Sequence, residues 1–480
     1  MIVSPAQLRK LSVRLLPFSD AASETLPLAA LLRLSLFQVS VGMAGVMLLG
    51  TLNRVMIVEM SLADTLVAVM IALPVLIAPF RALLGFRSDP YRSAIGWKRI
   101  PYLWFGSLWQ MGGLAVMPFA LLVLEGNTVH HVPFAGEVLA ALAFLMTGLG
   151  MHMTQTAGLA LAADRASDET RPRVVALLYV MFLVGMGLSA LLVGWLLTDY
   201  SPLRLIRVVQ GAAVATLLLN LVALWRQERL RPMTACERAS PRPRFAAAWQ
   251  DLARGGEAGR LLVTVFLGTM AFTMQDVLLE PYGGEILGLS VSSTTLLTAL
   301  WACGALAGFA LAARRMSRRA NPYRLAATGL IAGLVAFSAV IFAAPMASGS
   351  LFFVGSTLIG FGGGLFAVAT LSAAMTMATG DLAGRGLALG AWGAAQATAS
   401  GLAIALGGGL RDSVNALAAT GQWGTAVATP ATGYLFVYHT EIALIFATLI
   451  ALGPLVRRRT QSWGPAASTP SRIGLADFPT

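Results

Sequence analysis

Polar side chains inside apolar stretches are the residues of this chain that could do chemistry. His152, Gln155 and Thr156 share one face of an apolar stretch, and Gly148 lies one helical turn before His152. An imidazole can ligate the metal of a flat ring, and a glycine would leave that ring room to approach. The alternative is a hydrogen bond between neighbouring helices, which is what polar residues commonly make inside a membrane bundle. His439 is a second candidate with the same two interpretations.

A first group of charges lies toward one end of two apolar stretches. Arg54 and Asp276 occupy similar positions in the two stretches, with Glu59 and Glu280 close by in the sequence. A lone charge in lipid costs roughly 2.5–3.5 kcal/mol on insertion scales, so these side chains should pair or face water. We expect an Arg54–Asp276 ion pair that closes the mouth of a central cleft, with Glu59 and Glu280 as alternative partners. Each side chain could instead extend to the membrane interface on its own.

A second group of charges lies beside the other ends of the apolar stretches. Its members are Asp89, Arg92, Lys98, Arg99, Asp164, Arg173, Asp381 and Arg385. Ion pairs among them would hold two parts of the chain in one orientation. Topology alone is the alternative explanation, because positive loops orient a membrane protein without any partner.

The pattern does not indicate catalysis or a metal site. The four histidines are scattered, and each lies without a paired serine or cysteine, so no nucleophile, base and orienting group come together. Cys236 lies in a charged loop and Cys303 within an apolar stretch, so the two sulfur atoms are not expected to meet in a disulfide. We therefore expect no enzyme, no disulfide and no bound metal ion.

The composition excludes an ordinary soluble protein. Of 480 residues, 57% are hydrophobic and 12% are charged, and the mean hydropathy is +0.74, whereas soluble domains are about 45–50% apolar and 25% charged. A membrane-spanning helix needs about 20 apolar residues. We predict an all-α polytopic membrane protein with twelve transmembrane helices, at 31–57, 63–85, 100–124, 134–163, 173–198, 203–225, 260–281, 291–314, 323–345, 350–378, 383–410 and 432–456.

The basic residues predict the orientation of these helices. Of the 34 Lys and Arg residues, 30 lie on one side of the predicted membrane, and Arg54, Arg204, Arg207 and Arg411 lie in or near the other side. Cytoplasmic segments carry the excess of Lys and Arg, so both termini are expected in the cytoplasm. The net charge of +12 thus reflects topology, and we expect membrane lipids as partners and no nucleic acid.

The longest connection divides the chain into two similar parts. We predict a cytoplasmic segment at 1–30, a six-helix half at 31–225, a linker at 226–259, a second six-helix half at 260–456 and a tail at 457–480. Phe245, Trp249 and Leu252 recur at helical spacing in the linker, which predicts a short helix on the membrane surface, with a solvated loop as the alternative. A faint repeat between the halves is typical of a transporter of the major facilitator type, a 6+6 pseudo-symmetric bundle.

Glycines cluster in the tenth and eleventh predicted helices. Small residues allow helices to approach closely in lipid. Five of them would therefore offer an outer face to another transmembrane helix, namely Gly360, Gly364, Gly390, Gly393 and Gly401. The same glycines could simply pack the helices of this chain against one another.

Several long stretches resemble a known family. They are 34–43, 50–59, 78–83, 87–89, 96–99, 150–158, 171–177, 275–285 and 384–390. These stretches are similar to the PucC/LhaA family, the bacteriochlorophyll-delivery branch of the major facilitator superfamily in phototrophic bacteria. The usual second loop of that superfamily is altered: Gly85 and Asp89 match it, but Arg87 and Pro90 do not, so its ordinary gating role is in doubt.

The resemblance implies an assembly factor for light-harvesting antennae in the cytoplasmic (intracytoplasmic) membrane of a phototrophic bacterium. It implies antenna polypeptides as partners, with the reaction centre–LH1 complex or pigment-synthesis enzymes as further ones, and a transiently bound bacteriochlorophyll. His152, Gln155, Gly148 and His439 would then be the pigment-binding candidates. The segment at 16–20 and the segment around His152 look more like the LH1-type than the LH2-type member. An exporter or flippase of a tetrapyrrole-like molecule and a pigment-free scaffold remain as alternatives.

Overall fold

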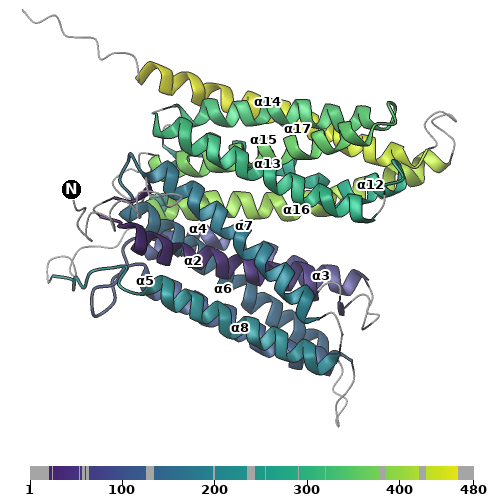
Figure 1. The fold of residues 1–480 in the computed structure, drawn as a ribbon. Coiled ribbons are helices and arrows are strands. Elements are labelled where there is room, and N and C mark those ends of the chain that lie inside the picture. The colour runs from purple at the N-terminus through teal and green to yellow at the C-terminus, as the bar shows by residue number, and fades with distance from the viewer. Residues whose placement is uncertain are drawn as a thin grey trace, which may run out of the picture.

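The computed structural model describes residues 21–462, apart from 24, 53–54, 57–59, 61–63, 126–133, 198–200, 235–243, 255, 290, 319, 378–383 and 421–428. Every regular element of three or more residues within this part of the chain is a helix. Figure 1 shows these helices as two bundles side by side, one coloured purple to teal and the other green to yellow.

The first bundle holds the elements that precede the linker. They are α2 (Leu28–Gly45), the π-helix η2 (Val46–Leu52), α3 (Asp64–Leu76), α4 (Phe80–Ser88), α5 (Ile100–Leu124), α6 (Ala135–Arg165), α7 (Arg171–Leu196) and α8 (Pro202–Leu224). Most of these bounds lie within a few residues of the predicted helices, because each apolar window buries its backbone polar groups by forming a helix.

The second bundle follows the linker helix α10 (Phe245–Ala253). Its elements are α11 (Glu257–Thr273), the 3₁₀ helix η4 (Met274–Val277), α12 (Leu279–Glu285), α13 (Val291–Ser317), α14 (Pro322–Ala343), α15 (Gly349–Thr376), α16 (Arg385–Ala419) and α17 (Ala431–Ser462). The first membrane helix of each bundle thus changes helix type at a corresponding place, α2 into η2 and α11 into η4. Such broken helices at matching positions are typical of repeated transporter halves.

Eleven helices of the described part are long and apolar enough to cross a membrane. The predicted number is twelve, and α16 is the predicted membrane helix that is not among the eleven. This helix has 35 residues, but its middle is rich in glycine and alanine and carries Gln396, Thr398 and Ser400, so its hydropathy is low. It nevertheless lies alongside α11 and α17 within the second bundle. The chain is a multi-pass membrane protein.

The second predicted span, at 63–85, corresponds to the candidate span Val69–Ser88, but its helix is interrupted. The chain forms α3 and α4 with a turn between them. Pro79 has no N–H to donate, and Ala78 N–H donates to the Val75 carbonyl at 3.0 Å in place of the Pro74 carbonyl. The break leaves the Pro74 carbonyl without its helical partner.

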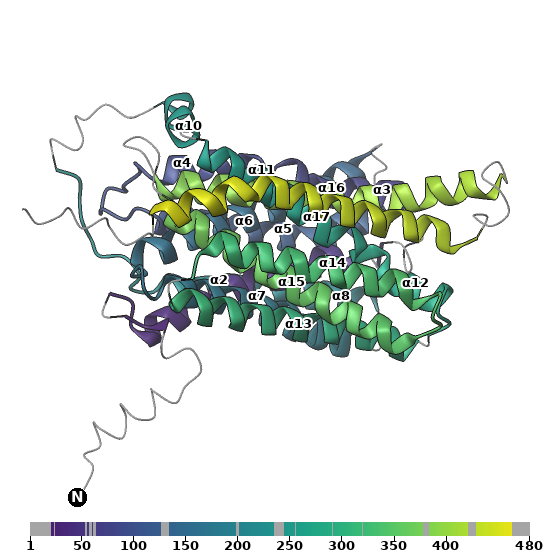
Figure 2. The same ribbon diagram turned by 90° about the horizontal axis from the view of Figure 1, so that it is seen from above.

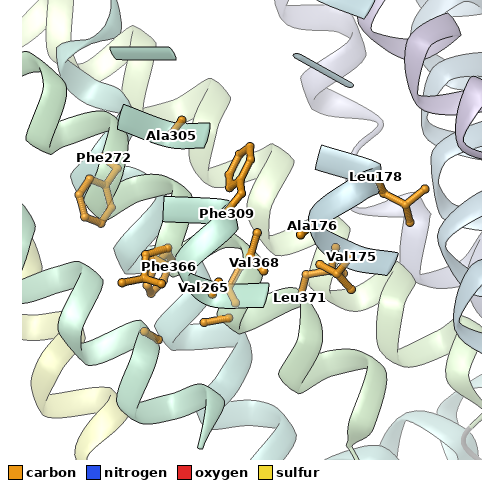
Figure 3. Close-up of a cluster of buried hydrophobic side chains, with 14 of the residues drawn as sticks. Val175, Ala176, Leu178, Val265, Phe272, Ala305, Phe309, Phe366, Val368 and Leu371 are labelled. Carbon is orange, nitrogen blue, oxygen red and sulfur yellow. The ribbon is translucent and has the colours of Figure 1, made fainter. Parts of the chain in front are cut away.

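The two bundles meet mainly along α4 with α16 and α7 with α13. Figure 3 shows Val175 and Ala176 of α7 close to the apolar side chains of the second bundle, among them Phe309 of α13 and Val368 of α15. These residues belong to one buried hydrophobic cluster that spans both bundles. A glycine pair completes the contact, because a methyl group on Gly85 of α4 would collide with the carbonyl of Gly386 of α16.

The linker helix α10 forms where the spacing of Phe245, Trp249 and Leu252 predicted one. Its residues Ala248 and Leu252 are buried, and the Phe245 ring meets the Phe86 ring of α4 edge-on, 5.4 Å between centroids. Figure 2 shows α10 beside α4 at one end of the bundle. Its apolar face therefore covers the ends of α4 and α16. The similar segment predicted at 7–16 lies outside the described residues.

Candidate functional site

A network of charges joins the two bundles where α5 and α16 begin, which we call the arginine-rich end. Its centre is Arg99, whose side chain is 0% exposed. Arg99 Nη2 lies 2.6 Å from Asp89 Oδ1 and Nε lies 3.1 Å from Asp164 Oδ2, while Nη1 donates to Ser88 Oγ. Two carboxylates therefore surround one buried guanidinium, which is the arrangement that offsets its desolvation.

Asp89 extends this network from the first bundle to the second. Its Oδ1 and Oδ2 accept hydrogen bonds from the backbone N–H groups of Gly386 and Leu387, each at 2.9 Å. These N–H groups belong to the first turn of α16, where a helix has free donors and a partial positive charge. Asp89 thus caps a helix of the other bundle. A methyl group at Gly384 would collide with the Asp89 carboxylate, so the glycine permits this cap.

Glu228 of the linker caps α5 in the same way. Its carboxylate accepts from the backbone N–H groups of Lys98 and Arg99 at 2.9 Å. Burial lowers the pKa of the Lys98 amine, and the charge of Arg99 lowers it further, although nearby carboxylates act in the opposite direction. Burial alone would also lower the pKa of Arg99, but Asp164 and Asp89 outweigh it and hold the pKa above the usual value.

The predicted group of charges at this end is only partly brought together. Lys98 Nζ lies 3.7 Å and Arg385 Nη1 3.9 Å from Asp164. Arg92 instead donates to the Arg231 carbonyl of the linker at 3.5 Å. Arg173 lies in the first turn of α7, and Asp381 lies outside the described residues.

Arg81 is a second buried arginine at the same interface, and the sequence patterns did not single it out. It lies in the first turn of α4 and is 2% exposed. Its Nε donates to Thr156 Oγ1 of α6 at 3.1 Å, its guanidinium lies against Gly393 of α16, and its Nη2 has no partner among the described residues. An arginine directly after Pro79-Phe80, at the apolar end of a membrane helix, is the signal that could have identified it.

The interpretation of His152 as a metal-ring ligand stays a prediction, and the contact that the structure shows is of the alternative kind, between helices. The Nε2 atom of His152 lies 2.9 Å from the Pro74 carbonyl, the group that the break between α3 and α4 leaves free. The expected space at Gly148 is also filled, because an added Cβ would lie 2.6 Å from the Pro74 ring. Gln155 Nε2 donates to Gln38 Oε1 at 3.5 Å. These polar residues therefore join helices of the first bundle.

His439 has a different environment, on the exposed side of α17. Its Nδ1 lies 2.7 Å from the Leu435 carbonyl of its own helix. A hydrogen bond from Nδ1 to a backbone carbonyl selects the tautomer whose Nε2 lone pair is free. Glu441, two residues on, is 0% exposed and faces the interior. His439 therefore presents this nitrogen on an exposed helix face, whereas His152 lies against the Pro74 carbonyl within the first bundle.

The predicted Arg54–Asp276 pair stays a prediction, because Arg54 and Glu59 lie outside the described residues. Asp276 accepts a hydrogen bond from the neighbouring Gln275 Nε2, and Glu280 accepts one from Thr298 Oγ1 at 2.6 Å. A network that the sequence patterns did not reveal lies nearby: Arg411 Nη2 is 2.9 Å from Glu285 and 2.7 Å from Tyr434 Oη.

The expectation that five glycines form an outer face is wrong in its geometry. Added methyl groups would collide with Trp301 and Ala305 at Gly360 and Gly364, with Arg81 at Gly390 and Gly393, and with Val75 at Gly401. All of these neighbours belong to α3, α4 and α13, against which α15 and α16 pack. The alternative interpretation, internal packing, describes these glycines.

A cavity of about 180 Å³ lies between the two bundles. Its walls are mainly apolar and include several aromatic rings, and its polar groups include Tyr179, Trp392 and Asp276. The Tyr179 hydroxyl and the Trp392 Nε1–H have no partner among the described residues. Drug-sized ligands occupy pockets of roughly 300–1,000 Å³, so this cavity is too small for such a molecule in the present conformation.

Comparisons with known proteins agree with this architecture. The "Uncharacterized protein in puhA-bchM intergenic region" of Rhodobacter capsulatus is 60% identical over 480 residues, all of both chains. "Protein PucC" of Rhodovulum sulfidophilum is 53% identical over 353 residues, 73% of this chain and 78% of that one. Among solved structures, a bacterial homologue of the iron transporter ferroportin in an outward-facing state has a TM-score of 0.69 at 14% identity, covering 89% of this chain and 100% of that one.

A Major Facilitator Superfamily transporter, FucP, in the outward conformation has a TM-score of 0.61 at 15% identity, covering 88% of this chain and 98% of that one. Both structures show the fold alone. The family model described as PUCC protein matches residues 51–460, most of the chain. The two named relatives cover between them the stretches from which the resemblance was drawn. This protein belongs to the PUCC protein family.

Proposed function

We propose that this protein is an assembly factor for a photosynthetic light-harvesting complex, that it binds antenna polypeptides and that it delivers bacteriochlorophyll to them. The observation that carries the proposal is the family match over residues 51–460, together with relatives named PucC. LH1 is the favoured client, because the segment at 16–20 and the segment around His152 look more like the LH1-type than the LH2-type member.

The outer face of α17 is the proposed site of antenna contact. Phe436, Phe446 and Ile450 are exposed there, at 46%, 53% and 77%, and Gly453 has open space where a side chain would stand. Helical spacing puts Phe446, Ile450 and Gly453 on the same side as His439. A transmembrane partner can pack closely at a glycine and against exposed aromatic rings. This face replaces the five buried glycines as the contact surface.

His439 is the proposed pigment ligand on that face. Its available Nε2 could ligate the magnesium of bacteriochlorophyll, which supplies the light-absorbing ring, while the Leu435 carbonyl holds the imidazole by its Nδ1. Pigment and antenna helix would then meet at one surface, and delivery would need no passage through the central cavity of about 180 Å³.

The test is purification in mild detergent, followed by an absorption spectrum and identification of the co-purifying polypeptides. His439→Leu should remove pigment and leave the protein folded, whereas His152→Leu, its matched control, should retain pigment. Gly453→Trp should reduce co-purification of antenna helices. If both histidine variants retain pigment, and pigment or antenna is lost instead when Gln38 or Gln275 is changed, the lateral surface is wrong and the transporter alternative is better.

The proposed orientation places both termini in the cytoplasm, in the intracytoplasmic membrane of a phototrophic bacterium. It rests on the 30-to-4 division of Lys and Arg. A reporter fused after residue 240 or at the C-terminus should be cytoplasmic, and one inserted within 125–133 should be periplasmic. A periplasmic reporter after residue 240 would contradict this orientation.

A further inference from the structure

A large cavity lies on the outer flank of the first bundle, away from the central cavity. It has a volume of about 710 Å³ and lies between α7 and α8, and Met43 of α2 also lines it. It opens on the exterior, where Leu192 and Trp195 of its lining are 51% and 72% exposed. Its volume is that of a pocket for a drug-sized or larger apolar molecule.

The charge at one end of this cavity is unusual. Arg204 and Arg207 line it, and they are the third and sixth residues of α8, within about 8 Å of the start of the helix by the helical rise. The first turn of α8 has no acidic residue. The helix dipole disfavours cations at this position. Both arginines also lie on the side of the predicted membrane that carries only four of the 34 Lys and Arg residues. Two features therefore disfavour the positive charge of Arg207, and an anion would offset both.

The cavity lining also contains a buried polar residue and a glycine with open space beside it. Ser189 of α7 lines it and is 2% exposed, and its hydroxyl has no hydrogen-bond partner among the described residues. Gly211 of α8 also lines it, and a Cβ added there would meet nothing within 4 Å. Arg207 likewise has no hydrogen bond or ion pair within the described part of the chain. The cavity thus combines a free cation, apolar walls and a buried hydroxyl.

We propose that this cavity binds one anionic phospholipid of the surrounding bilayer. The phosphate of the headgroup pairs with Arg207 beside Arg204, and an acyl chain lies along Leu192, Val193 and Val208 over Gly211. Ser189 donates a hydrogen bond to an ester carbonyl. A lipid fits better than a soluble anion because the cavity opens on the hydrophobic flank, and the arginines lie at the level where a membrane helix begins.

The experiment titrates the purified full-length protein in mild detergent with phosphatidylglycerol, with phosphatidylcholine of the same acyl chains, or with inorganic phosphate. Native mass spectrometry measures bound lipid, and thermal unfolding measures stabilisation. Phosphatidylglycerol should bind more tightly than phosphatidylcholine. Arg207→Gln should weaken phosphatidylglycerol about fivefold, as expected for one interfacial arginine, and leave phosphatidylcholine unchanged. Gly211→Leu should weaken both lipids by filling the cavity.

Two matched variants control for general effects. Arg229→Gln removes an exposed arginine at the arginine-rich end, and Gly409→Leu adds a side chain at an open glycine of α16; neither should change lipid binding. Equal affinity for the two lipids, or no effect of Arg207→Gln, would overturn the proposal. Stabilisation by inorganic phosphate equal to that by phosphatidylglycerol would also overturn it, because the site would then bind a free anion.

Discussion

Two buried arginines at the same interface have opposite surroundings. Arg99 is enclosed by Asp89, Asp164 and Ser88. Arg81 is nearly as buried, but Thr156 is its hydrogen-bond partner and no carboxylate pairs with it in the described part of the chain. Burying a charge costs several kcal/mol unless paired groups offset that cost. The protein offsets the cost at Arg99 and leaves much of it in place at Arg81.

This difference gives the contact between α4 and α16 two opposing contributions. Separating the helices would break the hydrogen bonds from Gly386 and Leu387 to Asp89. The same separation would let water reach Arg81, which lies against Gly390 and Gly393. The Arg99 network thus favours the closed arrangement, and Arg81 favours opening. Opposing terms of this kind permit a shift between two arrangements of the halves.

The largest expected effect comes from the paired arginine. Arg99→Met leaves two carboxylates without their common partner, so the free energy of unfolding should fall by about 3–5 kcal/mol. Thermal or denaturant unfolding in detergent measures this. Arg92→Met is the matched control, because Arg92 contacts a linker carbonyl and no carboxylate among the described residues. Equal stability of the two variants would mean that the network does not hold the halves together.

A smaller effect is expected at the glycines between the helices. Gly390→Leu would push a side chain into the carbonyl of Arg81, and overpacking of this kind destabilises proteins by about 1–3 kcal/mol. Gly409→Leu adds the same side chain in open space, so stability should change by less than about 0.5 kcal/mol. If both variants are equally stable, α4 and α16 do not pack as closely as the structure shows.

For the unpaired arginine we expect the opposite sign. Arg81→Met removes a buried charge whose cost is not offset, so stability should be unchanged or rise by about 1 kcal/mol. The same variant should lose accumulation of the antenna product if opening of this interface is needed for function. A loss of stability as large as that of Arg99→Met would show that Arg81 has a partner in the membrane and would remove the contrast.

The positions of the helices could be predicted from the sequence because the bilayer imposes them. The window at 100–124 coincides with α5 (Ile100–Leu124), since backbone polar groups in lipid are satisfied only within a helix or a closed sheet. The cap of α16 could not be predicted in this way. Asp89 and Gly386 are 297 positions apart, and the charge pattern contains no information about which carboxylate reaches which helix.

The candidate ligands show the same limit. For His152 the sequence left two interpretations open, a ring ligand and a hydrogen bond between helices. Its partner in the structure is a carbonyl that the break at Pro79 frees, and a helix predicted as continuous gives that carbonyl no role. The glycine content likewise predicted close helix packing, but it did not predict which neighbouring helix each glycine faces. In α16 the sequence pattern around a glycine that faces the interior is the same as that around one that faces outward. Gly393 and Gly409 differ only in what lies opposite them.

The smallest expected effect is a pH dependence that reports on the charge around Arg99. Burial and then the charge of Arg99 lower the pKa of Lys98 from 10.5 in the folded protein. Between the lowered value and 10.5 the unfolded chain binds more protons than the folded one, so stability should rise with pH in this window. Below both values the contribution is constant.

Unfolding measured from pH 7 upward should therefore show a slope that Lys98→Met reduces and Arg92→Met does not. Arg99→Met should also reduce it, because removing the neighbouring cation returns the pKa of Lys98 toward its usual value. An unchanged slope in Lys98→Met would mean that the carboxylates at this end fully offset the positive charges of Lys98 and Arg99. The difference in charge compensation between Arg99 and Arg81 would then be larger than the contacts of Arg99 alone indicate.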